Sequence, residues 1–317
     1  MKIIEHLNKA SETLISFEII PPKRGGNFKQ LMAALDDLVK FNPPFIDITS
    51  HAAEVIYEET SEGDYKMKVK RKRPGTLGIC ALIQNKYNVD AVPHVICKGF
   101  TKEETEDFII ELHYLGIDNV LAVRGDDSGF EKPIKYNRSA NIYAVDLVKQ
   151  ITDLNKGKYL EDTLLDADRM SFCIGVGGYP EKHFESPNVL MDIKYTKEKI
   201  KAGADYIVTQ MFYDNQKYYD YVKLCRDNGI DVPIIPGLKI LTSKNQLVSL
   251  PKSFYIDIPN ELAEEVENAK REHIPEIGAE WTLKQVQDLL EHNVPAIHFY
   301  VMQNTKPINL VMNKLKL

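Results

Sequence analysis

Short apolar runs separated by amphipathic segments form the main pattern of this sequence. Runs rich in Ile, Val and Phe are typical of buried β-strands, and they predict strands at residues 15–20, 45–50, 90–97, 119–123, 171–176, 206–212, 233–237 and 296–301. The segments between them carry apolar residues three and four positions apart, which predicts helices at residues 28–41, 75–86, 101–115, 140–153, 187–201, 213–228, 243–250, 260–272 and 282–292.

Local signals refine a few of these boundaries. Thr101 and Glu104 form a capping box that starts a helix. Ser186 followed by Pro187 predicts an N-cap with proline at the first helical position. Pro93 lies within the third predicted strand, where it lacks the N–H group that a sheet needs, so we expect it to interrupt that strand.

The alternation of strands and helices predicts the fold class. Eight strands that alternate with helices over residues 1–317, without a break in composition, favour an α/β protein with a single (β/α)8 TIM barrel as one catalytic domain. A doubly wound sheet is the competing fold. It is disfavoured because no G-x-G-x-x-G motif follows a strand, and Gly175-x-Gly177-Gly178 matches that motif only in part. A barrel of this type carries its chemistry at the carboxyl ends of the strands.

The first predicted strand ends in a carboxylate. Ser16 and Glu18 lie on one face, Phe17 and Ile19 lie on the other, and two prolines at residues 21–22 stop the strand. A charge at this place is costly unless it is paired, solvated or neutralised by a raised pKa. An apolar barrel mouth would raise the pKa of Glu18 and make it useful as an acid near neutral pH. The simpler alternative is a glutamate that reaches solvent at a strand end.

Other polar residues occupy the same place in the repeat. The carboxyl ends of the later strands carry Thr49, His94, Arg124, Asp126, Tyr179 and Gln210. This is an acid–base and hydrogen-bonding set without an activated nucleophile or a metal cluster. Each residue alone has a structural explanation: His94 could be a buried core histidine and Asp126 a helix cap. Their shared position at the strand ends favours a functional site.

Composition narrows the possible partners and compartment. The net charge is −6, from 40 Lys and Arg against 46 Asp and Glu, which argues against a nucleic-acid-binding protein. The four cysteines are scattered, which argues against a zinc site or a disulfide framework and fits the reducing cytoplasm. We expect no signal peptide and no membrane span, because no apolar run approaches the roughly 18 residues that a span needs. The basic run Lys66–Arg73 is expected to be a solvated face or loop.

Five motifs in order resemble one known family. They are Ser16–Pro22 (SFEIIPP), Leu121–Asp126 (LAVRGD), Ile207–Phe212 (IVTQMF), Ile235–Gly237 (IPG) and His298–Tyr300 (HFY). Together they resemble methylenetetrahydrofolate reductase of the bacterial type, which has the catalytic barrel without a regulatory domain. The resemblance implies an FAD enzyme that reduces 5,10-methylenetetrahydrofolate to 5-methyltetrahydrofolate with NADH or NADPH. The reaction is ping-pong, passes hydride through FAD and feeds methionine synthesis.

The resemblance also implies roles for individual residues. Glu18 matches the general acid, Asp126 matches the carboxylate beside the pterin and flavin, and Gln210 matches a contact shared by folate and nicotinamide. Thr49 matches a nicotinamide-side contact, and Gln246 matches a folate contact. The implied FAD contacts are Ser50, Ala52, His94, Arg124, Gly125, Asp126, Tyr143, Ala144, Tyr179, His183, Asp192 and Lys199. Arg124 and Lys199 are chemically suited to the pyrophosphate.

The sequence departs from the family pattern at a few positions. Tyr195 and Glu198 replace an Asn and an Arg near FAD, and Gln303–Asn304 replaces an Asn-Arg pair whose arginine binds the glutamate tail of folate. Lys306 could supply the missing charge.

Three alternatives stay open: another FAD barrel of the proline dehydrogenase type, a folate- or flavin-binding protein without activity, and a reductase that takes electrons from a protein carrier. The residues do not decide between NADH and NADPH. We expect a homo-oligomer.

Overall fold

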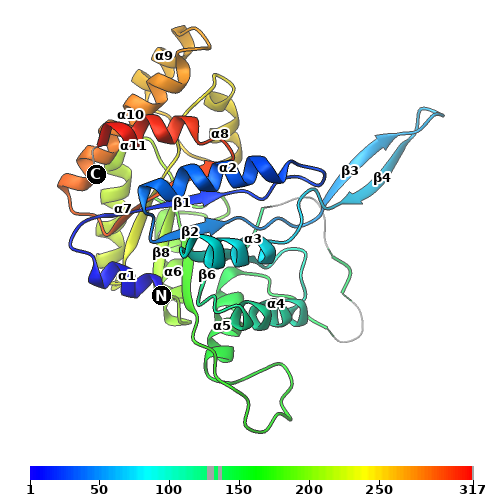
Figure 1. Ribbon diagram of the computed structural model, residues 1–317. Helices are drawn as coiled ribbons and strands as arrows, with labels where there is room; N and C mark the ends of the chain where they lie inside the picture. The colour runs from blue at the N-terminus through cyan, green and yellow to red at the C-terminus, as the bar shows by residue number, and fades with distance from the viewer. Residues whose placement is uncertain (127–131, 135–137, 316–317) are drawn as a thin grey trace.

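Eight parallel strands close a barrel (Figure 1) in the computed structural model, which describes residues 1–126, 132–134 and 138–315. The strand order around the barrel is β1-β10-β9-β8-β7-β6-β5-β2. The strands are β1 (Leu14–Ile19), β2 (Phe45–Ile48), β5 (Asp90–Ile96), β6 (Asn119–Val123), β7 (Cys173–Gly178), β8 (Tyr206–Met211), β9 (Ile234–Leu238) and β10 (Ala296–Met302). The predicted (β/α)8 barrel is therefore confirmed.

Most helices surround the barrel and bury their apolar faces against it, whereas α8, α9 and the start of α10 bury apolar residues in a separate cluster. They are α2 (Phe28–Leu38), α3 (Leu77–Leu82), α4 (Lys102–Tyr114), α5 (Ala144–Asn155), α6 (Val189–Lys201), α7 (Asn215–Asp227), α8 (Gln246–Phe254), α9 (Asn260–Asn268), α10 (Ile274–Glu291) and α11 (Lys306–Leu315). On β1, Ile15, Phe17 and Ile19 belong to the main core between strands and helices, as the alternation predicts. Ser16 and Glu18 consequently face the barrel interior.

Three predicted boundaries are wrong. Helix α6 is capped by Asn188, whose Oδ1 accepts the Met191 N–H at 3.0 Å, while the Ser186 hydroxyl donates to Asp192 instead. Helix α10 begins at Ile274, eight residues before the predicted start at residue 282. Pro93 does not interrupt β5, because it lies at the last pair with β2 and just before the first pair with β6.

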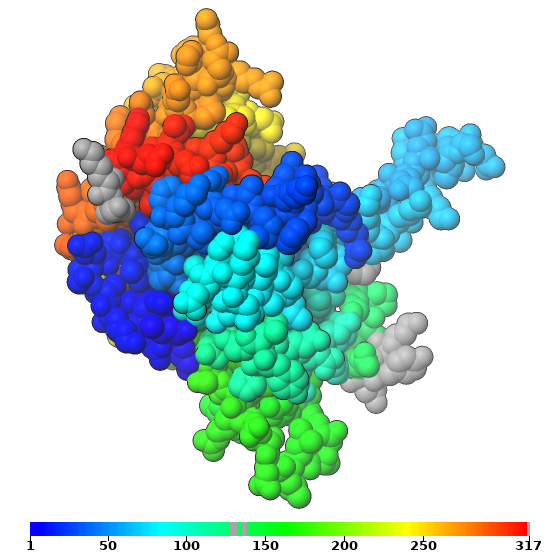
Figure 2. Space-filling view, in the orientation of Figure 1, coloured from blue at the N-terminus to red at the C-terminus, as the bar shows by residue number. Residues whose placement is uncertain are grey.

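The segment after β2 forms a hairpin that the apolar pattern did not predict. Strand β3 (Glu54–Glu59) pairs antiparallel with β4 (Tyr65–Lys70), and together they project from the barrel (Figures 1 and 2). We call residues 54–70 the arm. Most of the basic run Lys66–Arg73 lies on β4, whose residues are all exposed, as expected of a solvated face.

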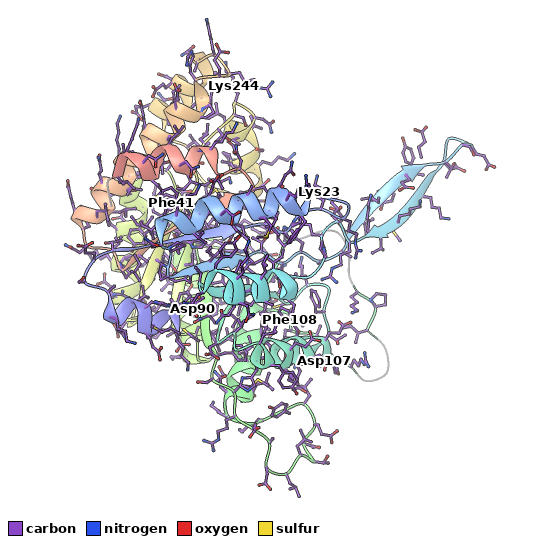
Figure 3. All side chains as sticks on the ribbon, viewed as in Figure 1. Lys23, Phe41, Asp90, Asp107, Phe108 and Lys244 are labelled. Atoms are coloured by element: carbon purple, nitrogen blue, oxygen red, sulfur yellow. The ribbon has the colours of Figure 1, made fainter. Side chains whose placement is uncertain are left out.

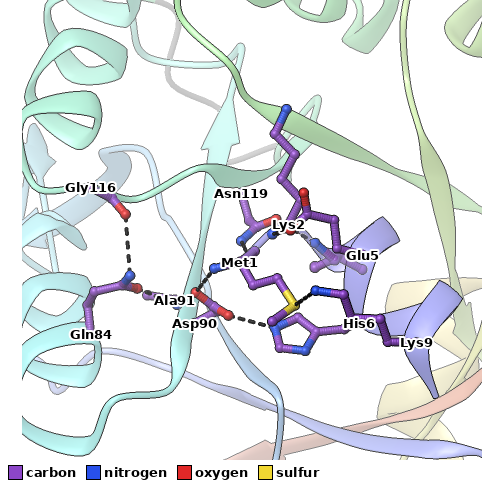
Figure 4. Close-up of polar contacts among 11 residues, drawn as sticks. Met1, Lys2, Glu5, His6, Lys9, Gln84, Asp90, Ala91, Gly116 and Asn119 are labelled. Atoms are coloured by element: carbon purple, nitrogen blue, oxygen red, sulfur yellow. Dashed lines mark hydrogen bonds and ion pairs between the residues drawn. The ribbon is translucent and has the colours of Figure 1, made fainter.

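A short helix at the N-terminus closes the amino end of the barrel. Helix α1 (Ile3–Lys9) buries Ile3 in the interior cluster that includes Phe45 and Tyr206. His6 Nε2 lies 2.6 Å from Asp90 Oδ2, and the Asn119 Oδ1 atom accepts the Ile3 N–H at 2.8 Å (Figure 4). Because α1 covers this end, the polar strand ends at the opposite mouth are the accessible part of the barrel interior.

Candidate active site

Glu18 lies between two histidines inside the barrel mouth. Its side chain is nearly buried, and its Oε2 atom lies 3.4 Å from His94 Nε2 and 4.0 Å from His298 Nε2. The pairing of β1 with β10 shifts by one residue directly after Glu18, which places a bulge at Val301. A β-bulge beside a functional site changes the direction in which the neighbouring side chains point. The alternative of a glutamate that simply reaches solvent is wrong, because Glu18 is paired and buried.

Two further members of this cluster were not assigned a role from the sequence. Asp47 on β2 is 1% exposed, and its Oδ2 atom lies 3.5 Å from His94 Nε2. His298 on β10 is fully buried, and its Nδ1 atom lies 2.9 Å from Ser16 Oγ. Both are polar residues within apolar strands, and this signal could have marked them as facing the interior.

The pKa of Glu18 is shifted in the opposite direction to the one expected from the sequence. Burial by itself raises the pKa of Glu18, but the neighbouring His298 ring and the positive charges of His94, His298 and Lys239 outweigh burial, so the pKa lies below its ordinary value. The expected raised pKa is therefore wrong for the free protein. Burial lowers the pKa of His94, yet its contact with Asp47 and the charges of Glu18, Asp47 and Asp126 raise that pKa overall. Both shifts favour a proton on His94 and a negative charge on Glu18.

A second polar group lies at the ends of β6 and β7 and on α6. Asp192 is 4% exposed and accepts the Ser186 hydroxyl at 2.8 Å and the His183 N–H at 3.3 Å. Lys199 donates to the Gly177 carbonyl at 2.5 Å, and burial lowers its pKa to about 8 despite the charge of Asp192. Tyr179 packs edge-on against His183, with 4.6 Å between the ring centroids.

The turn after β6 brings the two groups towards each other. Gly125 has φ +88°, and a Cβ atom there would lie 3.2 Å from the Ile96 Cβ, so only glycine fits without strain. Arg124, before it, pairs with Glu185. Asp126, after it, is exposed, and its charge helps to raise the pKa of His94. The structure thus places Asp126 within electrostatic reach of the Glu18 cluster.

The chemistry of this region fits a dinucleotide such as FAD. Arg124 and Lys199 supply two cations for a pyrophosphate. After the end of β2, the Thr49 Oγ1 and His51 Nδ1 atoms are buried and have no hydrogen-bond partner, as polar groups awaiting a ligand would be. The other predicted contacts lie on loops and helix starts at strand ends: half-buried Ser50 and Ala52 follow β2, exposed Tyr143 caps α5, and Ala144 begins α5.

A cavity of about 300 Å³ opens beside the ends of β9 and β10. It is lined by two of the predicted substrate-binding residues, Gln246 and Asn304, and by Lys239, which the sequence analysis missed. Gln246 accepts the Thr242 N–H at 2.6 Å, and Asn304 accepts the Lys306 N–H at 3.2 Å, so both side chains also shape their own loops.

Lys239 is a largely buried cation at this cavity. Its Nζ donates to the Tyr300 carbonyl at 3.3 Å, and burial lowers its pKa while the charge of Glu18 opposes that shift. Gln210, the third predicted substrate contact, lies outside the lining of this cavity. It sits where the β8–β9 register shifts, and its Oε1 accepts the Met211 N–H at 2.9 Å. The structure therefore brings Gln246 and Asn304 together but not Gln210.

Fold and site together define a (β/α)8-barrel protein with an acid–base cluster and a second group of charged residues at the carboxyl ends of its strands. Within the described residues, no three His, Cys, Asp or Glu side chains are grouped to hold a metal ion, and no described helix is long and apolar enough to cross a membrane. Residues 2–316 match the family described as "Methylenetetrahydrofolate reductase". The chain belongs to that family.

Individual relatives agree with this assignment. The chain is 29% identical to "Methylenetetrahydrofolate reductase (NADH) 1" of Arabidopsis thaliana over 99% of its own length and 50% of the relative. It is 26% identical to "5,10-methylenetetrahydrofolate reductase" of Pectobacterium carotovorum over 92% of its length and 86% of that protein. The chain thus spans about half the length of the plant relative but most of the bacterial one.

A solved structure shares the fold. An uncharacterized protein from Clostridium thermocellum, described as binding two copies of 5-methyl-5,6,7,8-tetrahydrofolic acid, superposes with a TM-score of 0.59 at 14% identity. The superposition covers 98% of both chains.

Proposed function

We propose that this protein reduces 5,10-methylenetetrahydrofolate to 5-methyltetrahydrofolate, using FAD and electrons from NADH or NADPH. The observation that carries the proposal is the buried Glu18 carboxylate held against His94 in the mouth of a barrel of this family. The relatives named for NADH, and others named for NADPH, support a nicotinamide donor without deciding which one this chain uses.

The second polar group is proposed to hold the cofactor. Arg124 and Lys199 would neutralise the pyrophosphate, and Asp192, His183 and Tyr179 would line the same pocket. When bound, FAD supplies the relay of hydride from nicotinamide to folate. The exposed Asp126 carboxylate is free to accept hydrogen bonds from the amide and amine groups of a pterin placed at the mouth.

The Glu18 cluster is proposed to deliver the proton that opens the five-membered ring of the substrate. In the free protein the lowered pKa of Glu18 favours its ionised form and the raised pKa of His94 favours its protonated form. His94 Nε2 lies 3.4 Å from Glu18 Oε2, so a small approach makes a hydrogen bond through which the proton passes. A bound substrate that excludes water disfavours the charged carboxylate and drives this transfer. Glu18 then protonates the leaving ring nitrogen of the folate.

Asp47 acts as a positioning residue for this step. Once His94 has given up its proton, Asp47 remains beside it at 3.5 Å and favours its reprotonation from solvent. Ser16 holds the His298 ring at 2.9 Å and so keeps the other wall of the cluster in place.

The cavity beside β9 and β10 is proposed to receive the charged end of folate. A largely buried ammonium is stable only with negative partners, and Lys239 has a carbonyl oxygen and the distant charge of Glu18. A carboxylate of the glutamate tail would complete its set of partners in the cavity that Asn304 also lines.

Anaerobic mixing tests the function. The purified protein should be yellow with about one FAD per chain, NADH or NADPH should bleach the flavin band, and methylenetetrahydrofolate should restore it. A colourless protein that does not take up added FAD would contradict the proposal. If chemically reduced flavin is reoxidised by folate but neither nicotinamide reduces it, a protein carrier is the electron donor.

A further inference from the structure

The arm has one apolar face, and this face is exposed to solvent along most of the length of the arm. Directly paired residues of an antiparallel ribbon point to the same side, so the pairs Val55–Val69, Tyr57–Met67 and Glu59–Tyr65 share a face. The exposed fractions are 67% for Tyr57, 69% for Tyr65, 59% for Met67 and 50% for Val69. Large exposed apolar side chains gathered on one face are typical of an interaction surface.

On the opposite face of the arm, charged side chains pair with one another. It carries alternating charges, and Lys68 pairs with Glu58 while Lys72, at the foot, pairs with Glu54 at 2.6 Å. The arm stands clear of the barrel, and its side chains point into open space on both sides (Figures 2 and 3). A two-stranded ribbon is marginally stable on its own in water. The apolar face therefore needs a partner that its own described chain does not supply.

Charge is distributed unevenly along the arm. The tip, residues 58–66, carries four carboxylates and one lysine, a net charge of −3. The foot, Glu54 with residues 70–73, carries four cations and one carboxylate, a net charge of +3. Glu54, Glu58, Lys66 and Lys70 lie on the opposite face of the ribbon. When a second arm is laid over the first in the opposite direction, the charges that approach each other are Glu59 and the turn residues Glu62 and Asp64 at one tip, and the cations of residues 71–73 next to the other foot.

We propose that the arm is a self-association surface, on which the apolar faces of two copies of this chain pack antiparallel. A two-fold interface needs a self-complementary surface, and the arm provides one in both charge and apolarity. The two-fold axis passes near Tyr57 and Met67, at the middle of the ribbon. The arm projects away from the rest of the molecule, so a second copy can approach it (Figure 2).

Edge-to-edge pairing of two arms is the less favourable geometry. Under two-fold symmetry it would set β4 against β4, with Lys66, Lys68 and Lys70 beside the same lysines, or the glutamates of β3 beside each other. Like charges on neighbouring strands oppose such pairing. Packing through the apolar faces avoids this conflict. Because two ribbons bury less area than a standard stable interface, the association depends on protein concentration.

Sedimentation of the full-length protein tests the surface without using any enzymatic readout. The wild type should dimerise as its concentration rises, and the double substitution Tyr57→Thr with Met67→Thr should weaken dimerisation by about tenfold or more, from the loss of apolar burial. Threonine keeps the β-propensity of the ribbon. The matched control is Ile56→Thr on the opposite face, which should leave dimerisation unchanged. A wild type that stays monomeric, or an oligomer unaffected by the double substitution, overturns the proposal.

A cysteine placed at the two-fold axis tests the pairing directly. Tyr57→Cys should be joined to the same residue of the partner copy by a short bis-maleimide cross-linker, because facing ribbons lie roughly 10 Å apart, whereas Ile56→Cys on the other face should not. The four native cysteines are buried and do not compete. Cross-linking that is equal for both variants, or absent for Tyr57→Cys in a sample shown to be dimeric, rules out the antiparallel arrangement.

Discussion

Replacing Lys239 with methionine keeps the length of the side chain and removes its charge. In the structure, the Lys239 ammonium lines the cavity with Gln246 and Asn304 and lies 3.3 Å from the Tyr300 carbonyl. If it holds a carboxylate of the folate tail, Lys239→Met removes one charge-assisted hydrogen bond. Such a bond is worth about 1.5–3 kcal/mol. The cavity opens to solvent, which screens the charge, so the lower part of that range applies.

The expected effect falls on substrate binding. A loss of about 1.5–2 kcal/mol corresponds to a rise of roughly 13- to 30-fold in KM for methylenetetrahydrofolate. The tail is remote from the reacting carbon and binds equally in ground and transition states, so kcat should stay unchanged.

The assay compares two substrates. Steady-state KM is measured for methylenetetrahydrofolate and for the corresponding pteroate, which lacks the glutamate. Wild type and Lys239→Met should bind the pteroate equally well. An exposed lysine on α8 that does not line the cavity, in Lys252→Met, is the matched control for a general loss of positive charge. An equal rise in KM for both substrates would refute the tail contact, and a fall in kcat with a shifted pH profile would assign Lys239 to the Glu18 cluster.

The other predictions concern the remaining site residues. Glu18→Gln should keep reduction of the flavin by nicotinamide and slow the folate half-reaction by roughly 10²–10⁴, the usual worth of a general acid; an equal loss in both half-reactions would indicate a structural role. Asp126→Asn should slow folate turnover more than nicotinamide oxidation. If the flavin potential and the folate affinity are both unchanged, Asp126 has only a structural role in its loop. Asn304→Arg should lower KM for the folate by about tenfold at most, with little change in kcat, and an unchanged KM would place the tail elsewhere. Since the pKa of His94 is raised in the folded protein, His94 contributes stability that is complete below its unfolded pKa of about 6.5 and is lost as the pH rises through its folded pKa. Urea unfolding at increasing pH should therefore show a loss of stability that His94→Asn lacks, and parallel profiles would contradict the charged His94.

The local sequence determined most of the barrel. Strands and helices follow from the spacing of apolar residues, because a strand buried between a barrel interior and a helix layer must be apolar whatever its neighbours are. The alternation around Glu18 likewise predicted which face of β1 points inward, and the structure confirms it. The capping box at Thr101 and Glu104 is equally local, and it is present as predicted.

Tertiary structure decided what surrounds those residues. The pKa of Glu18 depends on His94 on β5, His298 on β10 and Lys239 directly after β9, so the sequence around Glu18 could not reveal that the pKa is lowered. The cavity that joins Lys239 to Asn304 exists only because β9 and β10 are neighbours in the barrel.

The arm and helix α1 show the same limit at the level of whole elements. The alternation of β4 is visible in its sequence, but whether such a ribbon packs on the barrel or projects from it depends on contacts with other parts of the chain. Helix α1 is short and weakly patterned, and it is held by Asp90 and Asn119 on strands far along the chain. The sequence therefore determined the elements with local patterns, whereas charge, cavities and docking came from residues that only folding brings together.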